Sequence, residues 1–81
     1  MYQVVANLCD GNDYVAHWDG GVFDNIEDAI DFYNVWMPPE DEVQAALKEG
    51  IDMGDDLENY DLQVGVWDED GESHAFYSEG F

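Results

Sequence analysis

The stretch YDLQVGVWDEDGESHAFY, residues 60–77, decides the fold of this chain. Every second residue from Tyr60 to Val66 is apolar, which is the period of a strand with one buried face. An acidic, glycine-containing turn at residues 68–71 and a second strand over residues 73–77 complete a predicted β-hairpin.

A second hairpin is predicted near the N-terminus. In YQVVANL, residues 2–8, alternate side chains fall on one face of a strand. Turn residues at 10–13 precede another strand over residues 14–18, which Asp19-Gly20-Gly21 is expected to end.

The segment between the hairpins is predicted to form two helices. Asp24 is the expected N-cap of the first, with Glu27 three residues later. Apolar residues then recur at helical spacing as far as Pro38. The second helix is expected over residues 40–49, with Gly50 as its stop.

An acidic loop with one helical turn, at residues 51–59, completes the order ββααββ. This order predicts a small α+β fold, with a mostly antiparallel sheet and helices on one face. Hydrophobic residues make up 46% of the chain and aromatic residues 15%. Such a composition supports a single acidic domain over residues 1–81 rather than a disordered tail.

The charge balance excludes several classes of protein. The chain has 21 acidic residues and one basic residue, Lys48, for a net charge of −20. Binding to nucleic acid or to an anionic membrane requires clusters of Lys and Arg, and bidentate recognition of phosphorylated substrates requires Arg. We therefore expect neither nucleic acid nor membrane as a partner, but a protein that presents negative charge.

Cysteine content and hydropathy predict the compartment. The lone Cys9 cannot form an internal disulfide, which favours a reducing environment. The sequence has no signal-peptide pattern and no apolar run of about 18 residues, so we expect a cytoplasmic protein. The oligomeric state stays open, with a homodimer as one alternative.

Four acids spaced i, i+3, i+4 and i+7 share one face of the first predicted helix, and these are Asp24, Glu27, Asp28 and Asp31. Carboxylates at this spacing lie roughly 5–6 Å apart, similar to phosphates along a strand. Like charges here cost about 0.2–0.5 kcal/mol per pair, with no cation nearby to offset them. Capping and the helix dipole account for the first three positions, but not for Asp31.

Further acids follow on the second helix and in the loop after it. Those at the helix start also complement its dipole, and an acidic loop is often only a solvated face. The predicted partner-binding acids are Asp24, Glu27, Asp28, Asp31, Glu40, Asp41, Glu42, Asp52, Asp55, Asp56, Glu58 and Asp61.

A size comparison relates this charge to DNA. A globule of 81 residues has a diameter of about 30 Å, and duplex DNA carries about 18 charges over that length. The net charge of −20 is close to that of such a duplex. A basic DNA-binding groove would therefore meet a similar field from either object.

Neither a metal site, a cofactor nor catalysis is predicted. An EF-hand loop requires Gly at its sixth position, where a loop counted from Asp68 has Ser73. Cys9, His17 and His74 fall in or beside strands, without the sequence context of a nucleophile and its base. Many acid pairs could match a glycosidase, but 81 residues leave little room for a substrate cleft, so we expect no enzyme.

Residues 4–18, VVANLCDGNDYVAHW, followed by FDNIEDAI, resemble the start of the ArdA antirestriction family. The matching positions are Ala6, Asn7, Leu8, Asn12, Val15 and Trp18. ArdA proteins are longer, multi-domain acidic dimers. More broadly, the chain resembles the small acidic inhibitors of phages and mobile elements, which implies a mimic of DNA that occupies a nucleic-acid-binding site on a host protein.

Two hypotheses follow. The first is a DNA-mimic inhibitor that binds a DNA- or RNA-binding protein of a bacterial host, such as a restriction enzyme or a CRISPR effector. The second is an acidic interaction module without mimicry, either adapted to high salt or docking through exposed aromatic side chains. The candidate aromatics are Tyr33, Trp36 and Phe81.

Overall fold

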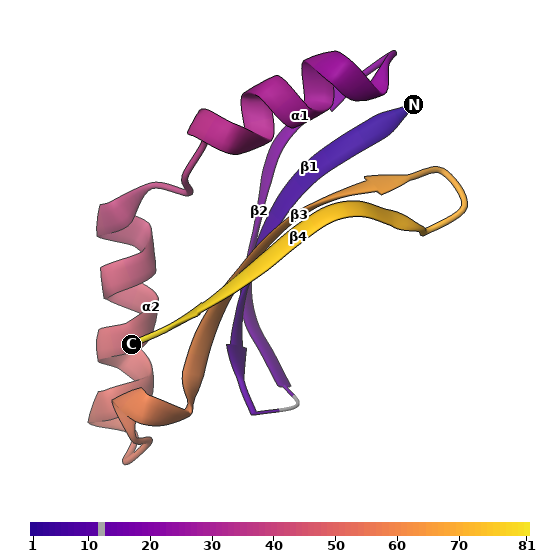
Figure 1. Cartoon of the computed structure of the whole chain (residues 1–81). Helices are drawn as coiled ribbons and strands as arrows, with labels where there is room; N and C mark the ends of the chain where they lie inside the picture. The colour runs from indigo at the N-terminus through magenta and orange to yellow at the C-terminus, as the bar shows by residue number, and fades with distance from the viewer. Residues whose placement is uncertain (12) are drawn as a thin grey trace.

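Two β-hairpins pair through their first strands to build one sheet. The computed structural model describes residues 1–11 and 13–81 (Figure 1). Its strands are β1 (Tyr2–Asp10), β2 (Asp13–Phe23), β3 (Tyr60–Asp68) and β4 (Ser73–Gly80), in the spatial order β2-β1-β3-β4. Each pair of neighbours is antiparallel. The prediction of an α+β fold with the order ββααββ is confirmed. Asn12, which belongs to the predicted turn and to the ArdA resemblance, lies outside the described residues.

Both helices pack on one face of the sheet (Figure 1). α1 spans Ile26–Val35 and α2 spans Glu40–Asp52. A 3-10 helix, η1 (Leu57–Asn59), precedes β3 and is the helical turn predicted in the acidic loop. In the part of the chain that the structure describes, no helix is long and apolar enough to cross a membrane.

The core lies between the helices and the two central strands. Alternate residues in the middle of β1 and along most of β3 are buried there, namely Val4, Ala6, Leu8, Tyr60, Leu62, Val64 and Val66. α1 covers one end of this row through Ala29, and α2 covers the other through Val43 and Leu47. The apolar residues that were predicted to alternate along both strands therefore form the sheet face that the helices cover.

β2 does not end at Asp19–Gly21, as predicted, but continues to Phe23. The register between β1 and β2 shifts in this region, which is the sign of a β-bulge. A Cβ on Gly20 would lie 3.0 Å from the Phe32 ring and 3.1 Å from the Trp36 ring. The glycine thus lets Phe32 of α1 and Trp36, the C-cap of that helix, approach the strand, and it does not end the strand.

The ends of α1 also differ from the prediction. Its N-cap is Asn25, not Asp24: the Asn25 Oδ1 accepts from the Asp28 backbone N–H at 2.9 Å, and its Nδ2 donates to the Asp28 carboxylate at 3.0 Å. The helix ends at Val35 instead of continuing to Pro38, and its C-cap, Trp36, already has an extended backbone. The Pro38 ring would clash with the carbonyl four residues earlier if the helix continued into it.

α2 continues past its predicted stop at Gly50 and ends at Asp52. Gly50 is buried, and a Cβ on it would collide with the Tyr60 hydroxyl. The chain turns instead at Gly54, whose φ of 101° favours glycine. Gly50 is therefore a packing residue that lets α2 approach the start of β3.

The molecule is longer than the sequence-based estimate of its size. Its Cα extents are 42 × 23 × 16 Å and its radius of gyration is 13.3 Å. The sheet is strongly twisted, and the two helices follow each other along it (Figure 1). The predicted diameter of about 30 Å was wrong because that estimate assumes a nearly spherical domain.

The contact between Gly50 and Tyr60 predicts that Gly50→Ala destabilises the protein. In an unhindered helix, the same substitution stabilises by about 0.5–1 kcal/mol. Here the added Cβ would displace Tyr60 or α2, so we expect a loss of roughly 1–3 kcal/mol in the free energy of unfolding, measured by urea denaturation. The double variant with Tyr60→Phe should recover part of this loss. A gain in stability from Gly50→Ala alone would contradict the packing.

Candidate functional site

The predicted partner-binding acids are all solvent-exposed. Six of them form what we call the acidic helix face, which comprises Glu27, Asp28 and Asp31 of α1 and Glu40, Asp41 and Glu42 of α2. Four form what we call the acidic end, which comprises Asp52, Asp55, Asp56 and Glu58. The apolar stripes of both helices face the sheet, and all six acids of the helix face are exposed to solvent.

Two predicted acids stand apart from these groups. Asp24 precedes α1, so the stripe predicted along the helix has three members within it rather than four. Asp61 lies between Tyr60 and Leu62, whose side chains are buried under the helices. Because successive side chains of a strand point to opposite faces, Asp61 lies on the sheet face away from the helices.

Among the described residues, no ion pair offsets the charge of the acidic helix face. Within residues 1–11 and 13–81, the ion pairs involve only the N-terminal amine, His17 and His74. Lys48 is exposed on α2 and forms no ion pair in that part of the chain. The carboxylates are therefore free to meet an external cation.

The acidic end approaches the tip of the first hairpin, which the sequence interpretation missed. The Gly11 backbone N–H donates to the Asn59 carbonyl at 3.2 Å, and the Tyr60 hydroxyl donates to Asp55 Oδ2 at 2.9 Å. Burial, with the nearby Asp55 and Asp13, raises the pKa of Asp10. Burial and the bond to Asp55 raise the pKa of Tyr60 to about 12. Carboxylates from two distant segments thus repel one another here.

Residues 51–59 were predicted to be an acidic loop and residues 10–13 a turn, but the proximity of the two segments has no local signal. It follows from the register of β1 with β3, which pairs Asp10 with Tyr60. Pairing of strands so far apart in sequence could not be read from either segment alone. Among the described residues, no cluster of three or more His, Cys, Asp or Glu side chains is arranged to hold a metal ion.

The three residues considered for nucleophilic chemistry have separate surroundings. The ring nitrogens of His17 lie 2.6 Å from Asn7 Oδ1 and 2.9 Å from Asp19 Oδ1. His74 Nε2 lies 2.8 Å from Asp68 Oδ2. Cys9 is buried, and burial together with the charge of Asp61 raises the pKa of its thiol. A thiol of raised pKa holds little of the nucleophilic thiolate.

Asp68 organises the turn between β3 and β4. Its Oδ1 accepts from the backbone N–H groups of Asp70 at 2.9 Å and Glu72 at 3.0 Å, while Oδ2 faces His74. The bond to His74, followed by the backbone bond from Glu72, lowers the pKa of this carboxyl. Asp68 is therefore a structural acid of the hairpin.

Of the three aromatic residues proposed for docking, Phe81 alone is exposed. Tyr33 and Trp36 are half-buried and pack against the core. Phe81 is 42% exposed, as a docking residue would be. The sheet face away from the helices carries Phe76, which is 49% exposed and contacts the edge of Trp67.

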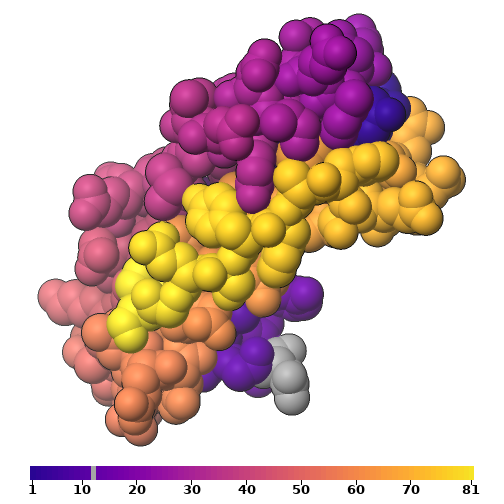
Figure 2. Space-filling model, in the orientation of Figure 1, coloured from indigo at the N-terminus to yellow at the C-terminus, as the bar shows by residue number. Residues whose placement is uncertain are grey.

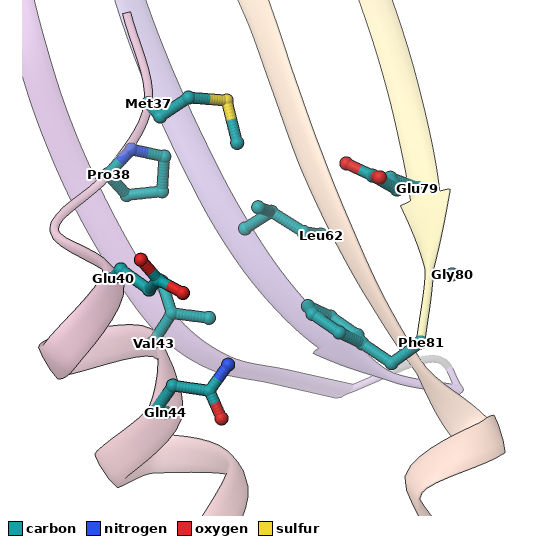
Figure 3. Close-up of a pocket in the computed structure, with 9 residues that line it drawn as sticks. All are labelled: Met37, Pro38, Glu40, Val43, Gln44, Leu62, Glu79, Gly80 and Phe81. Atoms are coloured by element: carbon teal, nitrogen blue, oxygen red, sulfur yellow. The ribbon is translucent and has the colours of Figure 1, made fainter.

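A hollow of about 280 Å³ lies between the start of α2 and the end of β4 (Figure 3). It is lined by Met37, Pro38, Glu40, Val43, Gln44, Leu62, Glu79, Gly80 and Phe81. Figure 2 shows the yellow end of the edge strand β4 beside α2. The prediction ended this strand at Tyr77, so it missed the hollow that the continuation of β4 to Gly80 completes.

Comparison with protein-family models, curated proteins and solved structures gives no match to this chain. The resemblance to the ArdA family therefore stays a prediction.

The pKa of Asp10 is raised and that of Asp68 is lowered, so the two residues should have opposite effects on how stability depends on pH. The folded-state pKa of Asp10 lies above 3.8, so its ionisation weakens the fold. Asp10→Asn should therefore stabilise the protein near neutral pH, and the gain should vanish below pH 3.8, where the carboxyl is protonated in both states. Urea midpoints measured from neutral to acidic pH test this.

The folded-state pKa of Asp68 lies below 3.8, so its ionised form strengthens the fold. Asp68→Asn should destabilise the protein at all pH values above 3.8. The difference from the unmodified chain should close only as pH falls through the lowered pKa. Effects of the same sign for the two substitutions near neutral pH would contradict this assignment.

Proposed function

We propose that this protein is a DNA-mimic inhibitor that occupies the basic nucleic-acid-binding site of a bacterial defence protein. The observation that carries the proposal is the acidic helix face, where two consecutive helices expose carboxylates that form no ion pair among the described residues. A purely structural role explains acids at helix starts through the dipole, but not Asp31 in the second turn of α1.

Shape and charge together support mimicry. Over the 42 Å length of the molecule, duplex DNA would carry about 25 charges, compared with the net charge of −20 here. The protein therefore approaches the linear charge density of a duplex along its long axis. A basic groove shaped for DNA would attract both through the same long-range field.

The inhibitor would act by occupancy rather than by chemistry. Electrostatic steering brings the acidic helix face to the basic groove, and contact then excludes DNA from it. Association should be fast at low salt and should slow steeply as salt screens the charges.

The second candidate is an acidic interaction module without mimicry. The exposed ring of Phe76 on the uncovered sheet face favours it, since aromatic side chains are enriched at protein interfaces. On this hypothesis, binding would depend on the sheet face and would be insensitive to competing DNA.

Capture from a bacterial lysate tests the proposal directly. The immobilised protein should retain DNA-binding proteins, and an excess of duplex DNA should elute them. Raised salt should elute them as well, because the contact is largely ionic. Partners that stay bound in the presence of duplex DNA would contradict mimicry and favour the second candidate.

Once a partner has been captured, charge reversal identifies the surface of this protein that contacts it. Glu27→Lys with Asp31→Lys should weaken binding by roughly tenfold or more, since both acids are exposed on α1 and take no part in the Asn25 cap. The matched control is Asp70→Lys with Glu72→Lys, which makes the same change of charge in the turn between β3 and β4. Equal weakening by both pairs would show that only net charge matters, and full binding by the α1 pair would move the site elsewhere.

A further inference from the structure

We infer that the hollow between α2 and β4 receives one arginine side chain of the partner protein. The inference rests on the proposed function, since it takes the partner to present a basic surface. It goes beyond that function in assigning a defined binding position and the residue type that fills it.

The floor of the hollow is apolar and buried. Val43 is 5% exposed and Leu62 4%, and Pro38 is also buried. The volume of about 280 Å³ lies at the lower end of the range for small-molecule sites, so it suits one side chain better than a cofactor. An apolar floor favours the methylene stem of a long side chain.

The walls of the hollow carry negative charge. Glu40 comes from the start of α2 and Glu79 from β4, on opposite sides of the hollow (Figure 3). Both residues are exposed, and an apolar occupant would cover their carboxylates without offering a hydrogen bond. A cationic head at the end of an apolar stem satisfies both the floor and the walls.

The aromatic ring in the wall favours arginine over lysine. The Phe81 ring is turned toward Val43 and Leu62, and it lines the same hollow (Figure 3). A planar guanidinium stacks on such a ring and has donors enough to serve two carboxylates at once, whereas an ammonium is compact and strongly hydrated.

The hollow is already formed in the free chain. The Tyr77 hydroxyl donates to the Met37 sulfur at 3.2 Å, which ties β4 to the segment between the two helices. A site that is fixed before binding loses less conformational entropy when it is filled.

The test uses N-acetyl-arginine amide as the probe, with NMR detection at about 0.15 M salt to screen the general field. We expect saturable shifts at the backbone amides of Val43, Gln44 and Gly80, which line the hollow. N-acetyl-citrulline amide has nearly the same shape but no charge, and N-acetyl-lysine amide has the positive charge without a planar guanidinium group. Both should bind more weakly than the arginine probe.

Two double variants with equal charge separate the hollow from the general field. Glu40→Gln with Glu79→Gln should weaken the arginine probe by roughly tenfold. Glu42→Gln with Glu58→Gln lies outside the hollow and should change its affinity by less than about twofold. Urea midpoints of both variants show whether the fold is intact.

Equal weakening in the two double variants, or shifts spread over the whole acidic surface, would overturn the inference. If the citrulline probe bound as tightly as the arginine probe, the hollow would be an apolar site that does not select for charge, and the inference would be wrong. If the lysine probe bound as tightly as the arginine probe, the assignment to arginine would be wrong. The probe needs no partner, so these results are independent of the lysate capture. If capture fails while the probe binds as expected, the hollow serves a partner other than a DNA-binding protein.

Discussion

The pairing of β1 with β3 is the constraint on which the rest of the structure depends. It aligns the alternate apolar residues of two distant segments into one row, which the helices then cover. Among the described residues, no charged or polar side chain is buried in the resulting core. A small core that admits no carboxylate leaves the whole charge of −20 on the surface, where mutual repulsion opposes folding. The hydrophobic row must therefore outweigh that repulsion.

Local patterns predicted most of this fold, and long-range contacts account for what they missed. Strand alternation and the apolar stripes of the helices are properties of single segments, so the element order could be read correctly. The roles of Gly20 and Gly50 could not be predicted, because each depends on aromatic rings from another part of the chain. Gly20 faces Phe32 and Trp36, and Gly50 faces Tyr60. A glycine predicts a turn and a close packing contact equally well.

In the candidate site, too, local patterns predicted some features, and long-range contacts account for those that were missed. An apolar stripe fixes which face of a helix is outward, so the exposure of the acids on α1 and α2 could be predicted from spacing alone. The approach of Asp10 to Asp55 could not, since it depends on the β1–β3 register. The hollow likewise requires β4 to continue beside α2, and neither segment shows this separately.

Charge and shape make different contributions to an inhibitor of the proposed kind. A field of this strength acts at long range and raises the rate of encounter with any basic protein, because it falls off only over a Debye length of about 8 Å. Charge alone therefore cannot distinguish one DNA-binding protein from another. Selection between them requires short-range contacts that a phosphate backbone does not offer. On the inference above, the hollow would supply them, because its apolar floor and the Phe81 ring lie beside two carboxylates. A partner with an arginine in the matching position would be favoured over one that offers only positive charge.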